Sequence, residues 1–266
     1  MKRVPLPLWL TALFLYVFMY APIVVVIVFS FNAARHGGPW RGFTTEWYTR
    51  LLNSPEKIAA ARNTLVLGVA STVVATALGT MLGYGLNRYR FAGKRFVSLL
   101  MYIPVVIPDI VMAVAMLSFY AVVRDWLGLF QLGMTTMIIA HITFQIPFVA
   151  IVVRSRLAGM GPAIEEAAHD LGANAWGTFW HVTFPLMLPG VLAGAMLAFT
   201  LSLDDFVVSF FTTGPGAATL PILIYASVKR GITPDINALS TLIVLASVVG
   251  TIGVTLLQRP RQPLRG

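Results

Sequence analysis

The sequence predicts an all-α integral membrane protein with six transmembrane helices. Of its 266 residues 58% are hydrophobic and only 11% are charged, and the mean hydropathy is +0.81. Soluble domains carry about 25% charged residues. Apolar windows of about 18 residues or more, long enough to cross a hydrocarbon core of about 30 Å, recur along the chain.

Short polar segments separate the expected spans. The spans cover residues 8–31, 60–86, 97–123, 133–153, 187–211 and 238–258. The first follows Met1-Lys2-Arg3, but its apolar run exceeds the roughly 7–15 residues of a signal peptide and no clear cleavage site follows. We therefore expect it to be retained as an anchor, and six spans to place both termini on one side.

Proline marks where several helices begin or break. Ser54-Pro55-Glu56 combines a cap, a first-turn proline and a first-turn acid, so the second helix is expected to begin near Ser54. Thr233-Pro234-Asp235 repeats this pattern before the last span. Pro104 and Pro108 predict a kinked or broken third span. The apolar run 220–228 is too short to span, so it is interfacial or re-entrant, either as an outer gate or as a packed lid.

The positions of Lys and Arg orient the chain. With the N-terminus inside, the cytoplasmic segments contain Lys2, Arg3, Arg88, Arg90, Lys94, Arg95, Arg154, Arg156, Arg259, Arg261 and Arg265. The outer segments contain Arg35, Arg41, Arg50, Lys57, Arg62, Arg124, Lys229 and Arg230. Short loops weigh most, and the turn 87–95 carries four basic residues. Both termini are therefore expected in the cytoplasm, and the net charge of +9 reflects topology rather than a nucleic-acid surface.

Catalytic signals are absent from the sequence. There is no cysteine, which excludes disulfides and thiol chemistry, and Gly93-Lys94 lacks the upstream glycine of a phosphate-binding loop. His36, His141, His169 and His181 lack metal-ligand spacing, so structural roles are expected for them. We therefore predict a non-catalytic chain that binds no metal or cofactor.

A polar stretch interrupts the apolar pattern from Glu165 to Gly172. Pro162 suits the first turn of a helix and Gly172 the left-handed residue that ends one. Asn174 can cap a second short helix, expected to run to about His181 before Pro185 breaks it. Such a segment either docks a partner protein or packs only on its own membrane domain.

The spacing of this stretch resembles the "EAA" loop of ABC importer permeases. The pattern is Glu166-Ala167-Ala168, Gly172 after three residues, and Pro185 after an apolar pair in which Val182 replaces the usual Ile and Phe184 the usual Leu. The resemblance implies the type I importer permease fold and a coupling loop, about 156–186, that docks on a cytoplasmic ATPase. The residues it assigns to coupling are Glu165, Glu166, Ala167, Ala168, Asp170, Gly172 and Pro185.

Acidic residues in the apolar spans are the second candidate site. Asp204 and Asp205 follow the apolar run from Leu186, and Asp109 follows the prolines of the third span. A carboxylate in hydrocarbon costs about 2.5–3.5 kcal/mol on insertion scales, so it faces either a watery pathway, where it can attract a cation, or a structural partner. Phe206 and Tyr225 could add cation–π contacts, or serve only as packing residues.

Further segments resemble the polyamine branch of these permeases, in particular the second permease of spermidine/putrescine importers. They are residues 197–206, 213–216, 219–221 and 234–238, with Tyr20-Ala21-Pro22-Ile23 and Ser30-Phe31-Asn32 near the N-terminus. The resemblance implies a small organic polycation as substrate and location in the bacterial inner membrane. It also implies a heterodimer with a second permease, two copies of an ATPase that holds ATP and Mg²⁺, and a periplasmic or lipoprotein binding protein.

One transmembrane domain is expected over residues 1–266. Residues 1–53 form its first helix and outer loop, 54–258 a five-helix core, and 259–266 a cytoplasmic tail. Related branches carry opines, iron, thiamine or sulfate, which leaves other small solutes as alternatives. An ion-coupled secondary transporter would need inverted repeats that the sequence does not clearly show. A structural or assembly protein would explain the loop but not the acids in the spans.

Overall fold

The structure, a computed structural model, describes residues 5–34, 39–161, 163–231 and 233–257, with side chains up to residue 249. These residues form helices and one isolated β-bridge, between Asn32 and Phe43, and they contain no strand. The chain divides into two compact units. The terminal unit comprises Met1–Ile58 and Ile224–Gly266, and the central unit comprises Ala59–Leu223.

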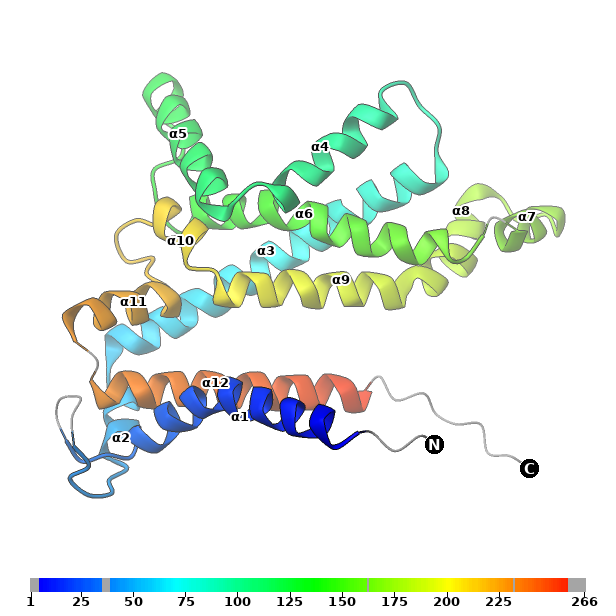
Figure 1. The fold of residues 1–266 in the computed structure, drawn as a ribbon. Coiled ribbons are helices and arrows are strands. Elements are labelled where there is room, and N and C mark those ends of the chain that lie inside the picture. The colour runs from blue at the N-terminus through cyan, green and yellow to red at the C-terminus, as the bar shows by residue number, and fades with distance from the viewer. Residues whose placement is uncertain (1–4, 35–38, 162, 232, 258–266) are drawn as a thin grey trace. The chain divides into compact units, whose positions relative to one another are not determined.

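The terminal unit is built on α1 (Leu6–Phe29), α2 (Glu46–Leu52) and α12 (Pro234–Leu257). The helix α12 contacts both others, and α1 and α12 run side by side (Figure 1). Lys57 donates to the Asp235 carboxylate at 2.5 Å, joining the start of α3 (Pro55–Arg88) to the first turn of α12. Both helices begin where the Ser-Pro-Glu and Thr-Pro-Asp signals predict.

The central unit is organised around α6 (Met134–Ala158), which packs along α9 (Phe184–Asp204). Its core combines Val149, Val153 and Leu157 of α6 with Met187 and Ala198 of α9. The short helices α7 (Ala163–Asp170) and α8 (Ala175–Thr178) lie at one end of this pair and α10 (Val207–Thr212) at the other (Figure 1). The remaining helices are α4 (Lys94–Val106), α5 (Asp109–Leu127) and α11 (Leu220–Arg230), the last shared by both units.

Glycine lets α3 approach α6 closely. A Cβ on Gly79 would lie 2.8 Å from the Ile146 carbonyl oxygen, and one on Gly83 would lie 2.7 Å from that of Ala150. Membrane helices associate through small residues of this kind, because lipid supplies no hydrophobic drive to bring them together. These two positions therefore fix α3 against the buried centre of the unit.

Five of the described helices are long and apolar enough to cross a membrane. They are Leu6–Phe29, Pro55–Arg88, Asp109–Leu127, Met134–Ala158 and Ala175–Asp204; the described apolar part of α12, Pro234–Val249, is shorter. The predicted third span is divided, as its prolines indicate: α4 ends at Val106 and Pro108 precedes α5. The helix α11, eleven residues long, is short as expected.

Two expectations for the fifth span are wrong. The span does not run unbroken to residue 211, because Asp205 is extended (φ −65°, ψ 122°) and separates α9 from α10. Pro185 does not break the preceding helix, because a π-helical turn, η1 (Phe179–Thr183), leads from α8 directly into α9. A π turn can absorb the hydrogen bond that proline cannot donate.

Candidate functional site

The helix α7 ends as its sequence predicts. Gly172 has φ +87°, the Ala173 N–H donates to the Ala168 carbonyl at 3.0 Å, and the Gly172 N–H donates to that of His169 at 2.9 Å. This left-handed ending satisfies carbonyls that the helix leaves free. The Asn174 side chain then accepts from the Gly177 N–H at 2.7 Å and starts α8.

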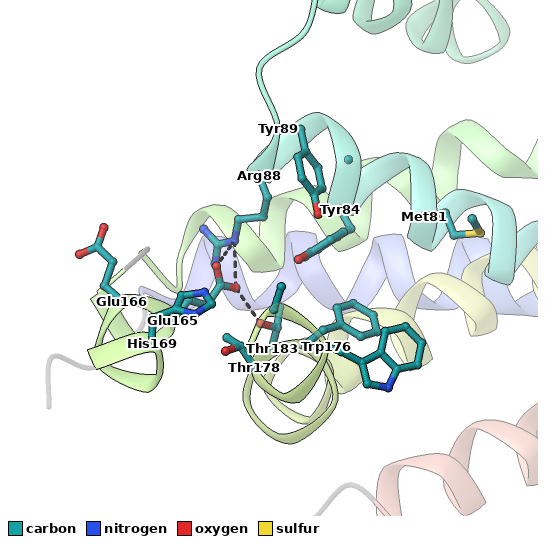
Figure 2. Close-up of a pocket in the computed structure, with 13 residues that line it drawn as sticks. Met81, Tyr84, Arg88, Tyr89, Glu165, Glu166, His169, Trp176, Thr178 and Thr183 are labelled. Carbon is teal, nitrogen blue, oxygen red and sulfur yellow. Dashed lines mark hydrogen bonds and ion pairs between the residues drawn. The ribbon is translucent and has the colours of Figure 1, made fainter. Parts of the chain in front are cut away.

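Glu165 anchors α7 to the membrane helices. Its carboxylate accepts from Arg88 Nε of α3 at 3.0–3.1 Å and from the Thr183 hydroxyl of η1 at 2.8 Å (Figure 2). Arg88 also donates to the Gly161 carbonyl at 3.3 Å. The Arg88 and Glu165 side chains are only 14% and 17% exposed, so their charge-assisted bonds are stronger than those of a surface pair. A displacement of α7 therefore acts directly on α3 and on the start of the fifth span.

Most other residues of the predicted coupling set are exposed to solvent, and we call them the open part of the loop. Glu166, Ala167 and Asp170 are exposed and Ala168 is half-buried. In Figure 2 Glu166 points away from the Arg88–Glu165 pair. Leu171 is 90% and Trp176 71% exposed, so bulky apolar side chains flank the acids. Gly172 and Pro185 are also exposed.

A cavity of about 700 Å³ lies between the end of α3 and the loop helices. Its lining includes Tyr84, Arg88, Glu165, Trp176 and Phe179 (Figure 2). Tyr84 and Phe179 meet edge to face at 5.2 Å. An aromatic contact between α3 and η1 therefore lies beside the Arg88–Glu165 ion pair.

The second candidate site lies at the break between α9 and α10. Asp204, the last residue of α9, is exposed. The Asp205 side chain is only 10% exposed, and its carboxylate accepts from the N–H groups of Val208 at 3.2 Å and Ser209 at 2.7 Å. His141 Nε2 of α6 lies 3.3 Å from the same carboxylate. Phe206 is half-buried in the break itself.

Two other predicted pathway residues belong to other helices, Asp109 to α5 and Tyr225 to α11. Asp109 is exposed in the first turn of α5. Tyr225 belongs to the terminal unit, and its ring lies 4.7 Å from the ammonium of Lys229. His141, expected to be structural, is the residue whose contacts with Asp205 the sequence did not indicate.

Among the described residues no cluster of three His, Asp or Glu side chains is arranged to hold a metal ion. Both sites are built from charged and hydrogen-bonding groups. At the loop, an exposed acid stands beside an anchored one. At the break, the exposed Asp204 likewise lies beside Asp205, which is bonded within the chain.

The chain is similar to known proteins along almost its entire length. It is 43% identical over 247 residues to the spermidine/putrescine transport system permease protein PotC of Escherichia coli K12, covering 93% of this chain and 92% of that protein. It is 38% identical to the putrescine transport system permease protein PotI of the same organism, covering 92% and 88%. Both relatives are permease proteins of transport systems.

Solved structures share the fold. A chain of a bacterial ABC transporter for import of the acidic polysaccharide alginate matches with a TM-score of 0.75 and 21% identity, covering 95% of this chain and 94% of that one. A chain of the MetNI methionine ABC transporter matches with a TM-score of 0.62 and 21% identity, covering 80% and 95%. Residues 75–261 match the family model described as binding-protein-dependent transport system inner membrane component. The chain therefore belongs to this family of transporter permeases.

Proposed function

We propose that this permease imports polyamines, such as putrescine or spermidine, in an ATP-driven complex. The observation that carries the substrate is the 43% identity to PotC over 93% of the chain. A small organic polycation also suits the exposed carboxylate of Asp204 at the end of α9. Opines, iron, thiamine and sulfate are the other solutes to be tested.

The loop from 156 to 186 couples the chain to its ATPase in this proposal. Glu166, Ala167, Ala168, Asp170 and Gly172 form the docking face, flanked by Leu171 and Trp176. Glu165 holds the loop to α3 and η1 through Arg88 and Thr183, so closure of the ATPase moves the membrane helices. Pro185 keeps its place at the start of α9, where the π turn joins loop and span.

The cargo passes Asp204 as the helices move between inward- and outward-facing states. Asp109, Phe206 and Tyr225 remain candidate pathway residues, and the segment 220–228 a candidate outer gate. Asp205 does not contact the cargo in this proposal, because its carboxylate is already bonded to groups within the chain.

The assembly is a heterodimer with a second permease, two copies of a cytoplasmic ATPase and a periplasmic or lipoprotein binding protein. The ATPase holds ATP and Mg²⁺, and this chain binds no cofactor of its own. Six spans cross the bacterial inner membrane as one domain, with both termini in the cytoplasm. The four basic residues of the 87–95 turn support this orientation.

Uptake by the reconstituted complex tests the proposal. Proteoliposomes containing both permeases and the ATPase, supplied with the binding protein and internal ATP, should accumulate labelled putrescine and spermidine but not thiamine or sulfate. Omitting ATP should abolish uptake. Accumulation driven by an ion gradient without the ATPase would favour a secondary transporter, and uptake of another solute alone would overturn the polyamine assignment.

A further inference from the structure

A buried polar network crosses the central unit at the break between α9 and α10. His141 Nδ1 lies 2.8 Å from the Ser202 hydroxyl of α9, and Nε2 lies 3.0 Å from that of Ser209 of α10 and 3.3 Å from the Asp205 carboxylate. His141, Ser202 and Ser209 are at most 2% exposed. One imidazole therefore joins both sides of the break to α6.

The network continues into α3. The Ser202 and Ser71 hydroxyls lie 3.4 Å apart, and the Gln145 amide donates to Ser71 at 3.2 Å and to the Ala198 carbonyl at 3.1 Å. With His141 protonated on Nε2, the donors can all point the same way: Gln145 to Ser71, Ser71 to Ser202, Ser202 to Nδ1, and Nε2 to Asp205 and Ser209. The chain of donors ends on the carboxylate.

Polar side chains in membrane helices are costly and normally serve a partner or a pathway. Here His141 links the buried network to Asp205, whose two oxygens already accept from the first turn of α10. Asp204, its neighbour, is exposed. The two acids therefore differ in what they can bind, although the sequence presents them as a pair.

We propose that His141 is a positioning residue of the transport pathway. With Ser202 and Ser209 it holds Asp205 on the first turn of α10, and this leaves Asp204 as the acid available to a cationic cargo. The part of this inference that concerns the cargo rests on the proposed function; the part that concerns the hold on Asp205 does not.

A cysteine reporter tests the hold on Asp205 without any cargo. The chain has no cysteine, so Val208→Cys, 1% exposed on α10, gives a single reporter thiol in this subunit of the full complex. In otherwise unchanged protein, and in Asp204→Asn, a small methanethiosulfonate reagent should react slowly. His141→Ala and Asp205→Asn should each speed the reaction about tenfold, the effect of losing a helix cap.

Ala150→Cys, fully buried in α6, is the matched control. Its labelling should not change in His141→Ala, because the network does not include it. Faster labelling at both positions would mean general loosening of the fold and would overturn the inference. So would an unchanged Val208→Cys rate in His141→Ala.

Uptake kinetics then separate the two acids. Asp204→Asn should raise the KM for labelled putrescine about tenfold, the loss of a charged hydrogen bond, at nearly unchanged maximal rate. His141→Ala and Asp205→Asn should lower the maximal rate instead, and their double variant should be no worse than either. His141→Gln, which keeps an amide donor for Asp205, should restore part of the rate.

Multiplying defects in the double variant, or an increased KM in Asp205→Asn with a neutral His141→Ala, would overturn the inference. A complex that imports no polyamine would instead overturn the proposed function. The cysteine reporter would still decide whether His141 holds Asp205.

Discussion

The molecule has two pairs of adjacent acids, Glu165-Glu166 in the loop and Asp204-Asp205 at the end of α9. The two pairs share one arrangement but differ in the groups that hold the bonded acid. In each pair one carboxylate is bonded within the chain and the other is exposed. Glu165 is held by an arginine and a hydroxyl. Asp205 is held by backbone N–H groups and a fully buried imidazole. The anchored acid of the loop therefore faces a full positive charge, whereas that of the break is held by backbone N–H groups and an imidazole.

The largest effect should come from a large charged side chain on the open part of the loop. Gly172→Arg should lower ATP-driven uptake at least about tenfold, because the new side chain blocks docking and non-glycine residues are strained at φ +87°. Uptake is measured with labelled putrescine, and insertion by immunoblotting of membranes.

Gly93→Arg is the matched control. Gly93 has φ +83°, and a Cβ there would likewise meet nothing within 4 Å, but it lies outside the coupling loop. It should be inserted and should transport nearly normally. Normal coupled uptake by Gly172→Arg would remove the docking role from the open half of the loop.

Removing the anchored acid should have the next largest effect. Glu165→Ala leaves Arg88 without its carboxylate at a site where both are mostly buried, and should destabilise the attachment of α7 by about 2 kcal/mol. The ratio of ATP hydrolysed to putrescine imported should rise. Arg88→Ala combined with Glu165→Ala should be less harmful than the sum of the two single changes.

Glu166→Ala distinguishes the halves of this pair. It should weaken coupling while leaving the thermal unfolding of the detergent-purified complex unchanged, because Glu166 is exposed. Equal losses of thermal stability for the Glu165 and Glu166 variants would show that the division into anchored and open acids is wrong for the loop.

The smallest effect should follow loss of the cap on α8. Asn174→Ala removes the acceptor of the Gly177 N–H and should cost about 1 kcal/mol, with a modest fall in coupling. Asn174→Asp keeps an acceptor and should behave like the parent. A stronger defect in Asn174→Asp than in Asn174→Ala would argue that this position contacts the ATPase rather than capping the helix.

Local sequence signals predicted where the helices of the loop begin and end, whereas the break between α9 and α10 was not predicted. Gly172 and Asn174 act on hydrogen bonds within a few residues of themselves, so their residue types predict where α7 ends and α8 begins. The prolines at 104 and 108 likewise predict the division of α4 from α5. The helix break predicted at Pro185 was wrong because a π turn precedes this proline. Such a turn depends on packing and has no sequence signal of its own.

At the break, the apolar residues on both sides of the acids resemble one continuous span. His141 is 61 residues from Ser202 and 68 from Ser209, so only the packing of α6 on α9 and α10 reveals that they meet. Adjacent residues of a helix point in different directions, so helical spacing alone separates Glu165 from Glu166. It could not do so for Asp204 and Asp205, because the helix ends between them.

The helical segment Ala175–Asp204 is one continuous element of 30 residues, with the π turn inside it. At about 1.5 Å per residue it is about 45 Å long. This long helix has the coupling loop at one end and the exposed carboxylate of Asp204 at the other. A tilt of about 5° at the loop end carries the far end sideways by about 4 Å, which exceeds the roughly 3 Å length of a hydrogen bond. A small rotation at the loop is therefore enough to make or break a contact at Asp204.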